Sequence, residues 1–328
     1  MTERNLCPVL FLCEKRIYMV YSRKEEKVPK MKKRFILILM LLGQCCAGCG
    51  SVEEPSVISG EAIITMPPVL EEKITPTPLE VVTETVELEE IIDKYSIANL
   101  LLLAKEPLGQ TMYVWGGGWN EEDTGAGADA CTMGVSPAWA IFAAEQDADY
   151  DYDDTRYQIH DGLDCSGYMG WLVYNVMETE DGRAGYVTKA TDMAADFAVR
   201  GFGEFTPAEE VKDWQAGDIM SMKGHVWMAL GMCEDGSVVL LHASPPGVML
   251  SGTRLKDDTV SQAEMLANEY MSMYYPEWYE RYPITVRDYD YLEKSSRMRW
   301  SEDVLSDEQG LRELSAEEVL QWLFAEVN

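Results

Sequence analysis

Apolar residues at helical spacing mark two segments of the chain. Over residues 88–105 they recur every three or four positions, which predicts an amphipathic helix that ends before Pro107. After Cys165 the same spacing predicts a second helix with one buried face. The members of that face are Met169, Leu172, Val173 and Val176. This spacing places Cys165 at or just before the first turn of a helix.

Short apolar runs separated by turn residues follow further along the chain. They predict strands over residues 219–222, 225–232, 238–243 and 247–251. Asp235-Gly236, between the second and third runs, is a hairpin signal. Consecutive short strands joined by tight turns pair antiparallel. The pattern therefore indicates an α+β fold, in which the helix that carries Cys165 packs on an antiparallel sheet.

The composition changes downstream of these strands. Residues 264–275 have helical spacing, and Ser315 with Glu318 forms a capping-box pattern ahead of another apolar run. Residues 256–328 are therefore expected to form a helical C-terminal extension. Residues 88–255 remain as the predicted core domain.

A long insertion, residues 119–160, interrupts this core domain. Its acidic run over residues 147–154 resembles a calcium loop, but Tyr152 stands where such a loop needs glycine, which favours a solvated acidic loop. Cys131 is followed closely by a proline, so no helix is expected to start there and we interpret Cys131 as structural. His160 is interpreted as part of the insertion's own structure.

The N-terminal residues have the pattern of a secretory signal. Basic residues up to Arg34 precede an apolar run over residues 35–42, which is too short to span a bilayer. Ala47 and Gly48 then precede Cys49. This pattern resembles the lipobox of bacterial lipoproteins, although a cysteine occupies the position where that motif usually has leucine.

The lipobox resemblance implies that residues 1–48 are an upstream extension followed by a lipoprotein signal peptide. It also implies that Cys49 is lipidated, so that the protein is extracytoplasmic, anchored in the membrane and facing the cell wall. A secreted protein is the alternative, and translation from Met31 instead of Met1 also fits the signal. Residues 49–87 are rich in Pro, Thr and Glu, and are expected to form an extended spacer.

Charge and cysteine content exclude two classes of protein. The chain has 27 Lys and Arg against 57 Asp and Glu, a formal net charge of −30. Such a surface repels phosphate backbones, so nucleic-acid binding is excluded. The eight cysteines form no regularly spaced framework, which excludes a disulfide-rich scaffold.

Cys165 is the candidate nucleophile. Unpaired backbone N–H groups and the dipole at a helix N-terminus favour a thiolate, and the pKa of a cysteine in such a place is typically lowered to roughly 3.5–7.5. The chain has only three histidines, and His225 and His242 both lie in predicted strands that neighbour each other. Paired strands bring such rings within hydrogen-bond reach, and thiol hydrolysis needs an imidazole that another group orients. A zinc site of the same three residues is an alternative.

Several short motifs in this order resemble the NlpC family of papain-like bacterial cell-wall peptidases. The resemblance covers roughly residues 90–255. The motifs are Tyr113-Val-Trp-Gly-Gly, Asp164-Cys-Ser-Gly, Gly217-Asp218, Gly224-His-Val and His242-Ala-Ser. The ordered set is far more specific than any one of its members.

The resemblance implies a papain-like core of the NlpC type, plus cleavage of peptidoglycan stem peptides without a cofactor. The bond typically cleaved joins γ-D-glutamate to a diamino acid. By the same resemblance Cys165 is the nucleophile, His225 the general base and His242 the residue that orients it. The positions that match those holding the amino end of the stem peptide are Tyr113, Asp164 and Ser166. The insertion 119–160 departs from the family pattern and is expected beside the substrate groove.

Two other functions remain open at this point. A papain-like amidase or acyltransferase would use the same nucleophile on a different bond. A non-catalytic lipoprotein would keep the groove only to bind the cell wall, although such a protein has no need of an intact set of Cys165, His225 and His242. The expected partners are therefore peptidoglycan stem peptides and, through the lipid anchor, the membrane.

Overall fold

The computed structural model describes residues 9–13, 16–20, 92–178 and 184–325. The chain divides into two units, residues 1–83 and 84–328. In the first unit, strand β1 (Val9–Cys13) pairs antiparallel with strand β2 (Arg16–Val20). The predicted lipidation site Cys49, the apolar run of the signal peptide and the spacer lie outside the described residues. The described part of the chain contains no helix that is long and apolar enough to cross a membrane.

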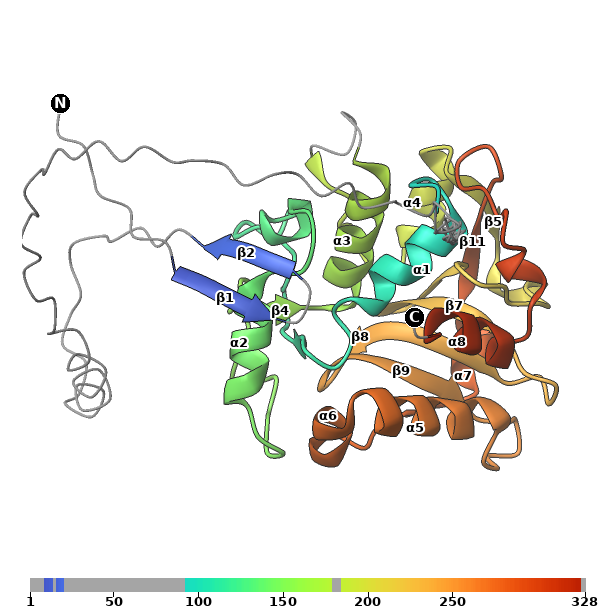
Figure 1. Cartoon of the computed structure of the whole chain (residues 1–328). Helices are drawn as coiled ribbons and strands as arrows, with labels where there is room; N and C mark the ends of the chain where they lie inside the picture. The colour runs from blue at the N-terminus through green and yellow to red at the C-terminus, as the bar shows by residue number, and fades with distance from the viewer. Residues whose placement is uncertain (1–8, 14–15, 21–91, 179–183, 326–328) are drawn as a thin grey trace, which may run out of the picture. The chain divides into compact units, whose positions relative to one another are not determined.

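A nine-stranded sheet lies at the centre of the second unit (Figure 1). Its order is β4-β3-β9-β8-β7-β6-β11-β5, and β10 pairs with β9. The β3–β4 and β9–β10 pairs are parallel, whereas the other pairs described in this sheet are antiparallel. The strands are β3 (Met112–Tyr113), β4 (Gly162–Leu163), β5 (Gly203–Thr206), β6 (Ile219–Met222), β7 (His225–Met232), β8 (Val238–Ser244), β9 (Gly247–Thr253), β10 (Val286–Arg287) and β11 (Ser296–Trp300).

Helices surround this sheet, and the mixed, mainly antiparallel architecture confirms the predicted α+β class. In Figure 1, α1 and α3 lie beside each other, and these two helices are in contact. The helices are α1 (Ile97–Lys105), α2 (Pro137–Glu145), α3 (Cys165–Met177), α4 (Met193–Val199), α5 (Gln262–Tyr274), α6 (Pro276–Arg281), α7 (Asp290–Lys294) and α8 (Ala316–Leu323).

The two faces of the sheet carry different layers. Successive residues of a strand point to opposite faces. In β7, Val226 and Met228 face the main core together with buried residues of α1, α3, α5 and α8. Trp227 and Ala229 face a smaller cluster on the other side, which Leu292 of α7 helps to cover. The strand residues on the second face of the sheet are therefore covered by the C-terminal part of the chain, which includes Leu292.

The first helix of this unit begins later than its periodicity predicted. Residues 88–91 lie outside the described residues, and those from 92 to 96 are not helical. Ser96 ends the non-helical stretch because its hydroxyl accepts a hydrogen bond from the backbone N–H of Asn99 at 3.1 Å, which caps α1. The helix ends at Lys105, before Pro107, as predicted.

The C-terminal segment, residues 256–328, is more than the helical extension that was expected. It contains β11, which lies between β5 and β6 in the central sheet. It also contains β10, which pairs with the end of β9 through Val286 and Arg287. Helix α8 packs on β7 and contributes to the main core. This segment completes the sheet, so residues 84–328 form one compact unit.

The insertion 119–160 packs against the core. Trp139 of α2 is fully buried and lies edge-on to Trp171 of α3, with 6.0 Å between the ring centroids. In the acidic run, the Tyr150 hydroxyl donates to the carbonyl oxygen of Tyr113 at 2.7 Å. The C-terminal segment holds the insertion from the other side, because Arg281 donates to two of its carbonyl oxygens. The insertion is therefore a packed element next to β3.

Candidate functional site

Cys165 is the first residue of α3, and Asp164 caps that helix. The Asp164 Oδ1 atom accepts hydrogen bonds from the Gly167 N–H at 2.7 Å and from the Ser166 hydroxyl at 2.8 Å. Its Oδ2 atom accepts from the Gly116 N–H at 3.2 Å. Burial raises the pKa of Asp164 to about 6, although all three hydrogen bonds act to lower it. The carboxylate therefore joins the start of α3 to the loop that follows β3.

That loop contacts α3 so closely that only glycine fits. A Cβ atom added to Gly167 would lie 1.9 Å from the carbonyl oxygen of Gly117, and that oxygen accepts the backbone N–H of Asp164 at 3.0 Å. The Trp119 indole then donates to the Ser166 hydroxyl at 3.0 Å. Both Asp164 and Ser166, which were expected to bind substrate, are thus engaged within the protein.

The thiol of Cys165 is buried, with 6% of the residue exposed. The pKa of Cys165 is raised to about 12, first by burial and then by the neighbouring charge of Asp164. The backbone N–H groups of Val226, Ser166 and Cys165 oppose this effect because they face the sulfur and favour the thiolate. The lowered pKa expected at a helix N-terminus is therefore not found, because loss of hydration outweighs the helix terminus.

His225 and His242 form a hydrogen-bonded pair, as their position in neighbouring strands predicted. The distance from Nε2 of His225 to Nδ1 of His242 is 2.9 Å. The Nε2 atom of His242 lies 3.0 Å from the Ser251 hydroxyl of β9. His242 is fully buried, and burial is the first cause that lowers the pKa of both imidazoles, that of His225 to about 3. Both rings are therefore neutral at physiological pH.

Two residues of the C-terminal segment complete this group, and sequence reasoning missed both. The Arg287 guanidinium donates from Nε to Nε2 of His242 at 3.2 Å. The Tyr291 ring lies against both imidazoles, with centroid distances of 5.5 Å to His225 and 6.3 Å to His242. No local sequence pattern predicts these contacts. The pairing of β10 with β9 brings Arg287 to His242, which is 45 positions earlier in the sequence.

The thiol and the imidazole pair approach each other at the beginning of β7. Cys165 belongs to the layer of α3, whereas His225 points to the opposite face of the sheet with Trp227. The N–H that faces the thiol belongs to Val226, the neighbour of His225. Cys165 is also close enough to Tyr291 for its charge to raise the pKa of that phenol, after the larger effect of burial. Within the described site no hydrogen bond joins Cys165 to His225.

Tyr113 lies on the other side of the thiol. Burial raises its pKa, and the charges of Cys165 and Asp164 raise it further, which places all three groups close together. The Tyr152 ring of the insertion meets the Tyr113 ring edge-on at 5.5 Å. The structure thus gathers Tyr113, Asp164 and Ser166 around the start of α3, and their role in holding a substrate stays a prediction.

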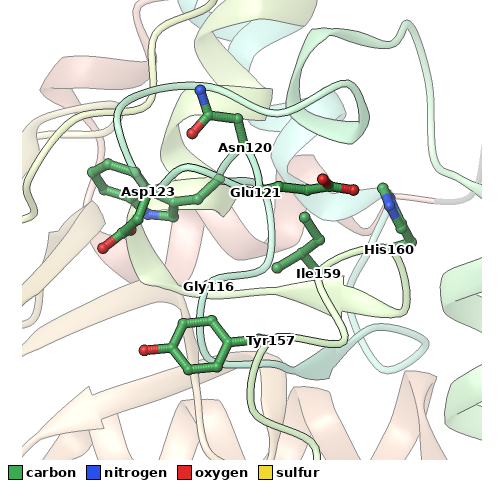
Figure 2. Close-up of a pocket in the computed structure, with 8 residues that line it drawn as sticks. Gly116, Asn120, Glu121, Asp123, Tyr157, Ile159 and His160 are labelled. Carbon is green, nitrogen blue, oxygen red and sulfur yellow. The ribbon is translucent and has the colours of Figure 1, made fainter.

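A pocket of about 380 Å³ lies next to this group (Figure 2). Gly116 and Trp119 belong to its wall and also hold Asp164 and Ser166, respectively. Figure 2 shows Glu121 and His160 on one side of the pocket and Asp123 on the other. The remaining lining residues are Asn120, Tyr157 and Ile159. The pocket is therefore built mainly by the insertion.

His160 lies apart from the other two histidines. Its Nδ1 atom lies 2.5 Å from the Asp129 carboxylate, and this hydrogen bond raises the pKa of His160. Cys131 and Cys233 are free thiols outside the group around Cys165. Among the described residues, no three His, Cys, Asp or Glu side chains are arranged to hold a metal ion. The zinc alternative therefore finds no support in the described geometry.

Comparison with known proteins adds no assignment. No family model, no curated protein and no solved structure matches this chain. The chemistry of the site must therefore be inferred from its own residues and their arrangement.

Proposed function

We propose that the protein is a cysteine endopeptidase that hydrolyses peptidoglycan stem peptides. Cys165 is the nucleophile, His225 the general base and His242 the residue that orients His225. The observation that carries this proposal is a buried thiol on the first turn of α3 that lies against the backbone N–H of Val226, the residue next to His225, while His225 is hydrogen-bonded to His242. A protein that only binds the cell wall has no need of this combination.

The reaction follows the general course of thiol hydrolases. The Cys165 thiol passes its proton to His225 while the sulfur attacks the scissile carbonyl carbon. The tetrahedral intermediate collapses to a thioester, and the leaving amine takes the proton from the imidazolium. Water then attacks the thioester with His225 as base, which releases the new carboxylic acid and restores the thiol. The N–H groups of Cys165, Ser166 and Val226 stabilise negative charge at the sulfur.

The neutral resting state of the site is compatible with this chemistry. The pKa of Cys165 is raised to about 12 and that of His225 lowered to about 3, so neither group is charged before substrate binds. Proton transfer between two neutral groups creates an ion pair, which needs a dry site with oriented dipoles. The helix terminus supplies oriented dipoles at the sulfur, whereas burial works against the ion pair because it raises the pKa of Cys165 and lowers that of His225.

The resemblance to NlpC-type peptidases supports the substrate class and a papain-like core. The proposed bond joins γ-D-glutamate to a diamino acid. The pocket beside Asp164 suits the amino end of such a peptide because Glu121 and Asp123 give it negative charge. The insertion that builds this pocket would select among stem peptides by their amino end. Lipidation at Cys49 would place this activity at the outer surface of the membrane. The alternative is a secreted protein without a lipid anchor.

Digestion of purified muropeptides by the full-length protein tests the proposal. Mass spectrometry should detect the gain of one water and a new amino terminus at the diamino acid. The Cys165→Ala variant should form no product, whereas Cys131→Ala serves as the matched control and should stay close to wild type. Cleavage of the amide between sugar and peptide would instead indicate an amidase. Transfer of the peptide to an added amine would indicate an acyltransferase, and tight binding without turnover a wall-binding protein.

A further inference from the structure

Arg287 makes an unusual contact for a residue beside a general base. Its Nε–H points at Nε2 of His242 at 3.2 Å, and one of its terminal nitrogens donates to the carbonyl oxygen of Val286 at 2.8 Å. The other terminal nitrogen lies 3.7 Å from the sulfur of Met249. No carboxylate of the described residues forms an ion pair with this guanidinium. The Arg287 cation thus lies directly behind the imidazole pair, and Asp288 is a carboxylate whose charge acts on it.

This contact determines which nitrogen of His242 carries the proton. A guanidinium has N–H donors and no acceptor, so Nε2 of His242 must present its lone pair to Arg287. A neutral imidazole carries one proton, which must then reside on Nδ1 of His242. That atom faces Nε2 of His225 at 2.9 Å, so Nε2 of His225 must accept. His225 therefore carries its own proton on Nδ1.

Ser251 does not oppose this arrangement. Its hydroxyl lies 3.0 Å from Nε2 of His242, and a hydroxyl either donates or accepts at that distance. Arg287 can only donate. Of the two groups that face Nε2 of His242, Arg287 is therefore the one that decides the tautomer.

This tautomer matters because it leaves His225 without a nitrogen that can accept the thiol proton. With Nε2 of His225 turned to His242, only Nδ1 is left to accept the thiol proton, and in this tautomer Nδ1 is already protonated. The absence of a hydrogen bond between the described residues Cys165 and His225 agrees with a resting state. We infer that Arg287 is a positioning residue that holds the His225–His242 pair in a resting tautomer and so keeps Cys165 a thiol. This inference rests on the proposed nucleophile and base.

The charged and titratable groups around the pair favour neutral imidazoles beside a charged guanidinium, although burial opposes that charge. The Arg287 cation lowers the pKa of both His225 and His242, in addition to burial. Asp288 and Tyr291 are the other titratable groups close to the guanidinium, and both act on its pKa. An anionic group on a bound substrate would compete with His242 for the guanidinium. When the guanidinium leaves, Nε2 of His242 takes a proton from solvent and donates it to Ser251, and the Nδ1 proton of His242 passes to Nε2 of His225. His225 then releases its Nδ1 proton to solvent, which makes Nδ1 of His225 available as a base.

Long-range ¹H–¹⁵N NMR of the imidazole rings in the ¹⁵N-labelled full-length protein tests this inference. The chain has three histidines, so His160 serves as an internal reference for an imidazole outside the pair. In the wild type both His225 and His242 should be protonated on Nδ1. Protonation of His242 on Nε2 in the folded wild type would overturn the inference without any variant.

The Arg287→Met variant removes both the donor and the charge at similar length. Both rings should change to the form protonated on Nε2, and alkylation of Cys165 by iodoacetamide at pH 7 should accelerate by about 10-fold or more, because a charged hydrogen bond no longer opposes proton uptake. Mass spectrometry assigns the modified cysteine. Arg254→Met is the matched control, since Arg254 pairs with Asp258 and does not contact the imidazoles.

Each outcome decides one of the two proposals. Unchanged tautomers, or alkylation that slows or stays constant in a folded Arg287→Met variant, would mean that Arg287 does not hold the resting state. If that variant fails to fold, Arg287→Gln removes the charge and replaces the obligatory donor with an amide that can also accept, and it should give the same change of tautomer. If the tautomers change as expected while no muropeptide is cleaved, the inference on Arg287 stands and the proposed substrate is wrong.

Discussion

Replacing Asp164 with asparagine should change how the stability of the protein depends on pH. The folded protein raises the pKa of Asp164 from 3.8 to about 6, because burial outweighs its hydrogen bonds. The folded state therefore holds the proton more tightly than the unfolded chain. The stabilisation is complete below pH 3.8 and is lost as the pH rises through 6.

The size of this effect follows from the two pKa values. Their difference corresponds to about 3 kcal/mol in the free energy of unfolding, of which about 2 kcal/mol falls between pH 4.5 and pH 7.5. Asparagine keeps an oxygen for the Gly167 N–H but turns an amide toward the Gly116 N–H, which loses its acceptor. That loss costs about 1–3 kcal/mol at every pH, so it shifts the whole curve and leaves the slope unaffected.

Urea unfolding, followed by tryptophan fluorescence at half-unit intervals between pH 4.5 and pH 7.5, measures the difference between wild type and Asp164→Asn. Wild type should lose about 2 kcal/mol relative to the variant across this range. The Asp192→Asn variant controls for the removal of a carboxylate, since Asp192 precedes α4 without a capping hydrogen bond from its side chain. A constant difference, or one of opposite sign, would mean that the hydrogen bonds outweigh burial at Asp164.

Three further predictions concern the base, the glycine contact and the anchor. His242→Asn, which keeps a hydrogen-bond partner for His225, should retain more muropeptide hydrolysis than His242→Ala; equal turnover of the alanine variant and wild type would assign the orienting role to another residue. Gly167→Ala should lower the free energy of unfolding by about 1–3 kcal/mol or more, because the added Cβ meets the Gly117 carbonyl oxygen. Gly125→Ala is the control and should leave the free energy of unfolding unchanged, since a Cβ there has open space around it; urea titration of both variants measures the difference. Cys49→Ala should leave the precursor uncleaved or release the protein from the membrane fraction, and unchanged processing and retention on a gel of cell fractions would contradict lipidation.

Local patterns in the sequence were sufficient for the central strands and for the start of α3. The predicted strands over residues 219–222 and 225–232 coincide with β6 and β7, because each is a short apolar run between glycine-containing turns. The first residue of α3 is Cys165, since Asp164 before it is a good capping residue. Alternation along paired strands also predicted the contact between His225 and His242. Each of these features depends on residues close together in the sequence.

Burial in the folded protein changed the acidity of the site residues, which the local sequence pattern does not predict. A helix N-terminus alone predicts an acidic thiol at Cys165, but the packed site raises the pKa of that thiol to about 12. The packing also made the insertion a wall of the pocket beside Asp164. Loss of hydration depends on every neighbouring group at once, so a local pattern carries no measure of it.

The sequence by itself determined the candidate nucleophile, the imidazole pair and the α+β class, because capping and alternation act over a few residues. Only the tertiary structure decided that residues 256–328 complete the sheet and bring Arg287 and Tyr291 to the imidazoles. The two residues of β10 have no strand pattern of their own, and their pairing with β9 depends on the packing of the chain between them. Long-range strand pairing of this kind is selected by the whole core, and a local sequence pattern does not reveal it.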